Sequence, residues 1–139
     1  MARIIHIDGP DKTGKDSIRR EVVSNSEGTA MVYVRSFLSQ IVYSRLYNRE
    51  INEDWFLAKW YRAFNLGEEF YFTDCSYEMV KERFILHNEM DLDIKDWENH
   101  RKVFYDVLKE PEEVGIEVKH IDTTSDTIAM SALKIQREL

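Results

Sequence analysis

The 139-residue chain has few of the residues on which covalent or metal-based stabilisation depends. Its one cysteine, Cys75, excludes an internal disulfide and fits a reducing cytoplasm. One cysteine and scattered histidines also disfavour a zinc site. No apolar run approaches the roughly 18 residues of a membrane span, and the first run is only long enough for a strand, so no secretory signal is expected.

Net charge and composition narrow the class further. The formal charge of -7 argues against broad attraction to duplex nucleic acid, where Lys and Arg must neutralise phosphates. A small anionic ligand in a locally basic pocket remains compatible. With 43% hydrophobic and 32% charged residues, the chain is typical of a globular protein, and its length predicts a single domain over residues 1–139.

The stretch IIHIDGPDKTGKDS, residues 4–17, is the most informative segment. An apolar run stops at Gly9 and is followed by four residues, Gly14 and Lys15. This order predicts a buried strand, a tight loop whose backbone N–H groups surround an anion, and a helix whose positive dipole end faces phosphates. The alternative is an ordinary glycine-rich turn. We interpret the segment as a phosphate-binding loop.

Individual residues of the loop have separate expected roles. Gly9 and Gly14 permit the turn and the close approach of the backbone. Lys15 is expected to reach the β- and γ-phosphates, and the hydroxyl that normally follows it holds magnesium. Here that place is Asp16, with Ser17 next, and both are candidate Mg²⁺ ligands. A carboxylate can coordinate the metal but also adds negative charge beside the β-phosphate. The predicted nucleotide-binding loop residues are Gly9, Lys12, Thr13, Gly14, Lys15, Asp16 and Ser17.

The rest of the chain alternates between strand-like and helix-like segments. Strands are expected at residues 4–8, 30–34, 70–73 and 116–121. Helices are expected at 15–24, with Val23 inward, and at 36–48 and 53–66. Three more follow: one capped by Asp74 or Ser76 and running through Arg83, one at 93–109 with Pro111 beyond its end, and one ending near residue 139. The expected fold is a three-layer α/β/α sandwich with a mostly parallel sheet of about four strands, of the P-loop NTPase type.

Four segments together resemble the thymidylate kinases and related nucleoside or nucleoside monophosphate kinases. The loop IDGPDKTGKDS places Asp11 and Lys12 where that family has an acidic and a basic loop residue. VRSFLSQIVY (34–43), DCSYEMVKERF (74–84) and KHIDTTSD (119–126) are similar to further family segments in the same order. Only the phosphate loop is a specific motif.

The resemblance implies phosphoryl transfer from ATP, with Mg²⁺, to a nucleoside or deoxynucleoside monophosphate. Asp11 would meet the acceptor, Lys12 and Lys15 the phosphates, and Arg35 the acceptor or transferred phosphate; these four are the predicted catalytic residues. Arg83, leading into a lid at residues 86–93, would bind the donor. Alternatively, Asp11 only caps the loop and Arg83 is a solvated helix residue. Arg35 follows a buried strand, where α/β folds place ligands.

The chain also departs from this family. Family members place a strand and a helix before the segment that begins here at Val34, and they carry an acid at that position. The lid contains no arginine. Two alternatives therefore stay open: a non-catalytic nucleotide-binding protein derived from such a kinase, and a kinase acting on a hydroxyl of a modified nucleic-acid base. The expected partners are small nucleotides and no membrane, and a homodimer stays open.

Aromatic side chains gather on two expected helices. Five lie between residues 55 and 64, and Tyr43 and Tyr47 are four apart on the preceding helix. Core packing is the expected use of the first group, with base stacking as the alternative. His6 is expected to be structural.

Overall fold

The computed structural model describes residues 2–86 and 91–137 and shows four parallel strands in the order β2-β1-β3-β4. The strands are β1 (Arg3–Asp8), β2 (Ala30–Val34), β3 (Glu69–Asp74) and β4 (Val118–Asp122). The helices are α1 (Lys15–Asn25), α2 (Phe37–Leu46), α3 (Glu53–Asn65), α4 (Tyr77–Leu86), α5 (Asp91–Glu113) and α6 (Ile128–Gln136). The expected fold class is therefore confirmed.

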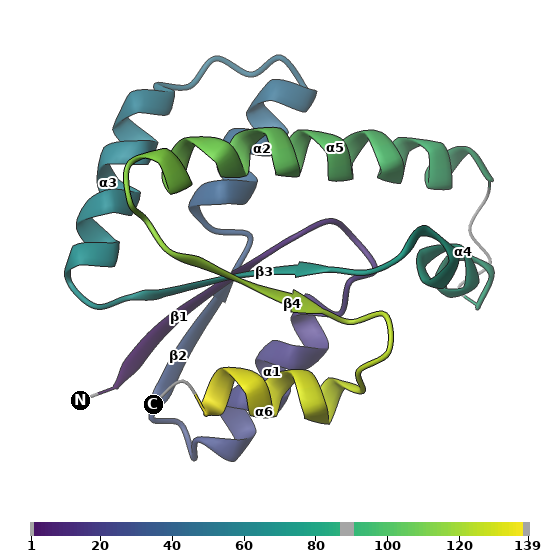
Figure 1. The fold of residues 1–139 in the computed structure, drawn as a ribbon, viewed down its shortest axis with the longest axis horizontal. Coiled ribbons are helices and arrows are strands. Elements are labelled where there is room, and N and C mark those ends of the chain that lie inside the picture. Colours follow the sequence, from purple (N-terminus) through teal and green to yellow (C-terminus); the bar gives the residue numbers. More distant parts are fainter. Residues whose placement is uncertain (1, 87–90, 138–139) are drawn as a thin grey trace.

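Helices cover both faces of the sheet, α1 and α6 on one side and α2, α3 and α5 on the other (Figure 1). The strands supply apolar side chains to each face because successive residues alternate. Ile5 and Ile7 pack toward α1 and α6, whereas Phe70 and Phe72 pack toward the opposite helices. Trp60 of α3 is 1% exposed, in accord with core packing for this part of the aromatic group.

Two expectations about local structure are wrong, and a third is decided between its alternatives. Pro111 lies inside α5, not beyond its end; the chain keeps helical bonding after it, and Val114 donates to the Pro111 oxygen before Gly115 ends the helix at φ 85°. Val23 is 37% exposed, because Ile18 and Val22 already fill the buried stripe of α1. Of the two expected caps of α4, Asp74 and Ser76, the structure has Ser76, whose hydroxyl accepts from the Met79 N–H over 3.2 Å.

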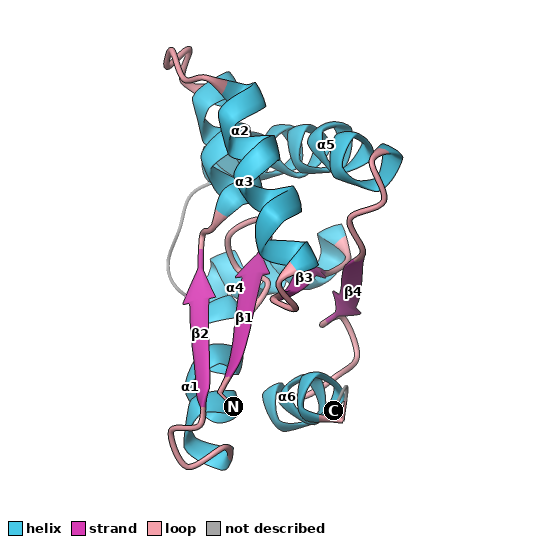
Figure 2. Ribbon diagram, turned by 90° about the vertical axis from the view of Figure 1, so that its left-hand side faces the viewer, coloured by secondary structure: helices cyan, strands magenta, loops and turns pink. Residues whose placement is uncertain are grey.

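The connection order places the phosphate loop at a special position in the sheet. From β1 the chain passes through α1 to β2 on one side, and then crosses to β3 on the other side of β1. The loop after β1 thus opens where the strand order reverses, at the carboxyl ends of the strands, which is where open α/β sheets bind ligands. Figure 2 shows β1 and β2 side by side, ending beneath α2 and α3.

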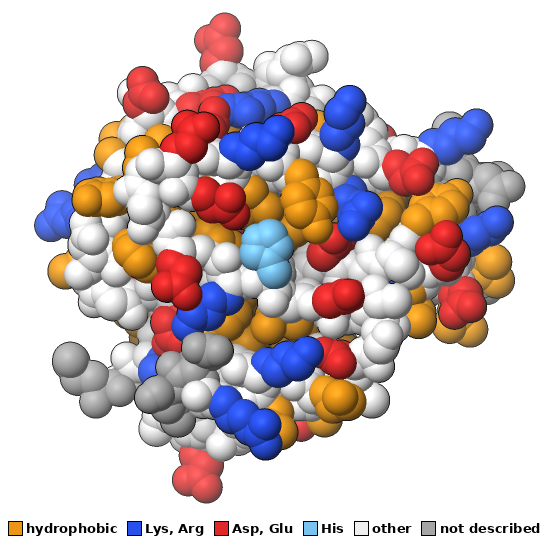
Figure 3. Space-filling model, in the orientation of Figure 1, with side chains coloured by type: hydrophobic (Ala, Val, Ile, Leu, Met, Phe, Trp, Pro, Cys, Tyr) orange, Lys and Arg blue, Asp and Glu red, His pale blue; other side chains and the backbone are white. Residues whose placement is uncertain are grey.

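The surface seen in Figure 3 has acidic and basic side chains interspersed rather than gathered by sign. In the part of the chain that the structure describes, no helix has both the length and the apolar character needed to cross a membrane.

Candidate nucleotide-binding site

Two buried threonines anchor the phosphate loop to the sheet. The Thr13 hydroxyl donates to the Pro10 oxygen over 2.6 Å and lies 2.8 Å from the Thr73 hydroxyl of β3. Both threonines are fully buried. A Cβ on Gly9 would lie 2.5 Å from Thr73 Oγ1 and closer still to the Thr73 carbonyl oxygen, so the loop and β3 meet only because residue 9 is glycine. The Thr13 side chain thus holds the loop rather than facing its opening.

The Lys15 ammonium lies inside the loop. Its Nζ donates to the Gly9 oxygen over 2.6 Å and to the Pro10 oxygen over 2.9 Å, and the residue is 4% exposed. Burial lowers the pKa of Lys15 to about 8; Asp11 opposes this shift and Arg35 adds to it. A phosphate in the loop would favour the charged form of this lysine.

The N-terminus of α1 points into the same loop. Gly14 caps the helix at φ 90°, in the left-handed region that glycine adopts without a Cβ penalty, and no side-chain hydrogen bond caps this end. The first N–H groups of an α-helix have no partner within the helix and carry its positive dipole end. Helix α1 has eleven residues, and its first N–H groups point at the loop. Backbone donors placed in this way bind anions such as phosphate.

Around the loop opens a cavity of about 480 Å³. Seven of the predicted site residues line it: Asp11, Lys12, Gly14, Lys15, Asp16, Ser17 and Arg35. Gly9, Thr13 and Arg83 do not. Sequence reasoning missed two lining residues, Arg20 and Phe84. Arg20 is four residues after Asp16 and so shares its face of α1, a spacing that could have indicated it. With Arg20, four cationic side chains face two carboxylates in one cavity.

Arg35 has an unusual backbone as well as a place in the cavity. It follows β2 at φ 58°, where a residue with a Cβ costs about 1 kcal/mol or more, and its N–H donates to the Ile7 oxygen over 3.2 Å. Its guanidinium lies 3.5 Å from the Asp16 carboxylate. Such strain is characteristic of sites where the surrounding structure fixes a side chain for function.

Asp8, at the end of β1, is a buried carboxylate that the sequence analysis did not single out. It accepts from the Ser36 N–H over 2.7 Å, from the Ser39 N–H over 3.1 Å and from the Ser39 hydroxyl over 2.6 Å. It thereby caps α2 and fixes the chain that leaves Arg35. Burial raises the pKa of Asp8 despite these bonds. His6 is structural as expected, hydrogen-bonded to Ser36 and Glu68 at 2.7 and 2.6 Å.

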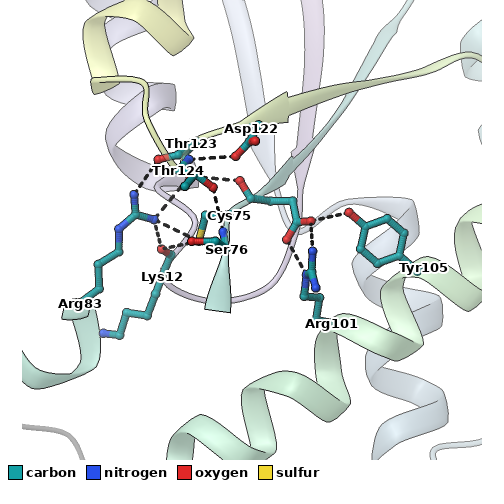
Figure 4. A network of polar contacts seen from close by, with 10 residues as sticks. Lys12, Cys75, Ser76, Arg83, Arg101, Tyr105, Asp122, Thr123 and Thr124 are labelled. Atoms are coloured by element: carbon teal, nitrogen blue, oxygen red, sulfur yellow. Dashed lines mark hydrogen bonds and ion pairs between the residues drawn. The ribbon is translucent and has the colours of Figure 1, made fainter. Parts of the chain in front are cut away.

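Arg83 reaches from α4 to the backbone of the phosphate loop rather than into the cavity. Its guanidinium donates to the Lys12 oxygen and, over 3.0 Å, to the Thr123 oxygen after β4 (Figure 4). Trp97 supports the loop similarly, donating from Nε1 to the Asp11 oxygen over 2.6 Å. Lys12 itself has φ 66°, so these two contacts hold the loop where its backbone is left-handed. Of the predicted lid, residues 87–90 lie outside the described residues.

A second polar cluster lies at the end of β3. The Arg101 guanidinium of α5 donates two hydrogen bonds to the Asp74 carboxylate, of 2.9 and 2.8 Å, and the Tyr105 hydroxyl donates to the same carboxylate. Figure 4 shows Arg101 and Tyr105 on the side opposite Arg83. Burial first, and then the bond to Asp74, raises the pKa of Tyr105 to about 12. This cluster ties α5 to the sheet, which explains why Asp74 does not cap α4.

Sheet order, loop and cavity together define a P-loop NTPase-like α/β fold. The YorR protein of Bacillus subtilis, solved in complex with phosphorylated GDP, has this fold and superposes with a TM-score of 0.82. The sequences are 13% identical, and the alignment covers 97% of this chain and 94% of that one. No protein-family model matches the chain. No curated protein matches it. The likeness to YorR is one of fold.

Proposed function

We propose that the protein transfers the γ-phosphoryl group of ATP, with Mg²⁺, to a nucleoside or deoxynucleoside monophosphate. The observation that carries this proposal is the gathering of Lys12, Lys15, Arg20 and Arg35 around one cavity at the mouth of the phosphate loop. Phosphoryl transfer needs mainly positioning and neutralisation of charge, and these four cations supply both. The nucleotide bound to YorR supports the same class of ligand.

The donor end of the site is the loop and the start of α1. The backbone N–H groups at this end and the Lys15 ammonium would hold the β- and γ-phosphates. Asp16 and Ser17 line the cavity with oxygen ligands, which are the kind Mg²⁺ prefers, and the substrate phosphates and water would complete its shell. Bound there, Mg²⁺ neutralises phosphate charge. Among the described residues, no three His, Cys, Asp or Glu side chains form a ready-made metal cluster, so two protein ligands are the expected number.

The acceptor end is marked by Asp11 and Arg35, which line the cavity. Tyr43 packs against the core outside this lining; burial, followed by the Asp11 carboxylate, raises the pKa of Tyr43 to about 12. Its ring lies 6.0 Å from that of Tyr47 and 5.8 Å from that of His100. Rings of this kind stack readily on bases. Asp11 would orient the attacking phosphate oxygen of the acceptor while Arg35 balances its charge.

In the proposed reaction an acceptor phosphate oxygen forms a bond to the γ-phosphorus as the bond to the β,γ-bridging oxygen breaks. ADP leaves with the bonding electrons. Lys15 and Arg35 would stabilise the charge that develops on the two sides of the transferred group. Lys12 is placed beside them on the cavity wall.

A non-catalytic nucleotide-binding protein is the second candidate. The Asp16–Arg35 ion pair favours it, because it occupies the arginine that transfer would need and sets a negative charge beside the phosphates. The binding chemistry of the two candidates is the same. They differ in turnover alone.

Incubating the protein with labelled ATP and Mg²⁺ against nucleosides, nucleoside monophosphates and single-stranded DNA tests the proposal. We expect label on a monophosphate. Lys15→Ala should abolish transfer, and Lys81→Ala, which removes an exposed lysine of α4, should leave it unchanged. ATP binding with no labelled acceptor would establish the non-catalytic nucleotide-binding protein. Label on single-stranded DNA would instead support a kinase that acts on nucleic acid.

A further inference from the structure

Strand β2 forms an edge of the sheet without the usual protection. Among the residues that the structure describes it pairs with β1 alone, and its sequence AMVYV contains no charge and no proline. Soluble proteins commonly guard such edges with charged residues, proline or bulges, because an unpaired strand is a template for another strand. Figure 2 shows β2 at the rim of the sheet. This edge is therefore suited to accept a neighbour.

The backbone of β2 has a definite set of groups directed outward. The Arg35 N–H donates to Ile7 of β1, and backbone groups alternate sides along a strand. Residues 31 and 33 therefore also face β1, whereas Ala30, Val32 and Val34 direct their N–H and C=O groups away from the sheet. Ser26 Oγ accepts from the Ala30 N–H at 3.2 Å. This leaves outward N–H donors at Val32 and Val34. The outward C=O acceptors include those of Ala30 and Val32.

The side chains next to this edge are apolar and exposed. Met31 is 49% exposed and Tyr33 is 47% exposed, both on the face of β2 that looks toward α3. Beside them lies a groove of about 570 Å³ that Tyr33, Phe37 and Trp55 line, and Trp55 is 50% exposed. The open backbone edge and the exposed apolar surface thus coincide.

We propose that a second copy of this chain pairs antiparallel with this edge, with the two-fold axis at Val32. Val32 then faces its own counterpart, and Ala30 faces Val34. The outward donors and acceptors of these residues meet in this register and in no register shifted by one. Met31 of each copy lies opposite Tyr33 of the other, in the closer type of cross-strand pair, where apolar side chains stabilise each other. One symmetric arrangement covers both exposed side chains.

Charge on β2 does not oppose the same arrangement. The strand itself carries no charge that would repel a copy. A short strand pair is a small interface, so we expect a dissociation constant on the order of micromolar. The pairing does not depend on the proposed kinase activity.

Sedimentation velocity over a range of protein concentrations tests the dimer. The wild-type protein should shift from monomer to dimer as concentration rises. Met31→Lys should weaken the dimer about tenfold or more, because it adds one charge per copy at the paired face. Met130→Lys on α6 is the matched control, since Met130 is also 49% exposed. A monomer at every concentration, or equal effects of the two substitutions, would overturn the proposal.

Cysteine cross-linking tests the register separately. A Met31→Cys/Tyr33→Cys double variant should form an interchain disulfide under mild oxidation, because directly opposite residues lie within bridging distance. Neither single variant should form this disulfide. Its cysteine lies opposite the native Met31 or Tyr33 of the other copy, and the matching cysteine of that copy lies at the more distant diagonal position. Cys75 is 2% exposed, so the wild-type protein is the blank. Cross-linking of the singles as efficiently as the double would contradict this register.

Discussion

The Arg35 guanidinium lies 3.5 Å from the Asp16 carboxylate, so the unusual acid of the phosphate loop pairs with the arginine predicted to serve the acceptor. Both side chains are about half exposed, at 50% and 48%. A pair of this kind is worth at most about 1 kcal/mol, so an arriving phosphate or metal ion can separate it easily. We therefore expect the Asp16 carboxylate to pair with Arg35 in the free protein and to bind Mg²⁺ when the metal and nucleotide are present.

Replacing Asp16 by Asn should have opposite effects with and without the metal. In the absence of Mg²⁺ the variant should bind ATP about threefold more tightly, since a repelling charge is lost and Arg35 is released toward the phosphates. With Mg²⁺ it should bind more weakly than the wild type, because a metal ligand is lost. Calorimetric titration with Mg²⁺ and with a chelator measures both. The same direction of change in the two buffers would exclude a metal-binding role for Asp16.

Nucleotide affinity should fall as pH rises through the pKa of Lys15. Burial lowers this pKa from 10.5 to about 8, so above that value the free protein loses the ammonium charge that the phosphates need. The association constant should then decrease by up to about tenfold per pH unit. Titrations at and above neutral pH, where the phosphates are already ionised, isolate the effect. Lys15→Arg keeps its charge throughout, and a decline of equal steepness in that variant would assign the titration to another group.

Gly9→Ala should cost far more stability than the same change at another glycine with positive φ. At Gly9 the new methyl group overlaps the buried Thr73 of β3, so the loop must move away from the sheet. We expect a loss of about 3 kcal/mol in the free energy of unfolding. At Gly67, φ is 92° but a Cβ meets nothing within 4 Å, so Gly67→Ala should cost only about 1 kcal/mol. Urea denaturation compares the two variants, and equal losses would show that the contact with Thr73 is not limiting.

Arg101→Ala should destabilise the protein more than Arg45→Ala. Without Arg101 the Asp74 carboxylate, 13% exposed, keeps only the Tyr105 hydroxyl as a side-chain partner within residues 2–86 and 91–137, at a cost of about 2 kcal/mol. Arg45 also bonds two carboxylates, Glu53 and Glu110, but these are 38% and 42% exposed, so its loss should stay below about 1 kcal/mol. The midpoints of thermal unfolding give the comparison. A larger loss for Arg45 would mean that the cluster at β3 does not hold α5.

The fold could be predicted from the sequence because the patterns that specify its strands, helices and phosphate loop each lie within a short segment of the chain. Alternating apolar segments and the loop between Gly9 and Gly14 fix four parallel strands and the site at the end of β1. The error at Pro111 has the same origin: proline usually ends a helix, but near the last turn the missing N–H costs little and the chain continues to Gly115.

The finer roles of site residues depend on contacts between distant segments, which no local pattern contains. Arg83 was expected at the donor, yet its bonds join the loop to Thr123, 40 residues away. Asp74 and Ser76 were equal candidates for the cap of α4, and Ser76 takes the role because Asp74 is held by Arg101, 27 residues later. The resemblance supplied Asp11 and Arg35 as candidates, and the cavity brings them together; their roles in transfer stay predictions.

The last prediction concerns turnover. Arg35→Ala and Asp11→Ala should each lower the rate of phosphoryl transfer by at least about tenfold, which corresponds to about 1.4 kcal/mol of barrier. The reason is that one balances charge on the transferred group and the other orients the acceptor. ATP affinity should change little, since the loop and Lys15 hold the donor. Arg19→Ala, which removes an exposed arginine of α1 that does not line the cavity, is the control. If both site variants lose ATP affinity and transfer in equal proportion, Arg35 and Asp11 belong to the donor site instead.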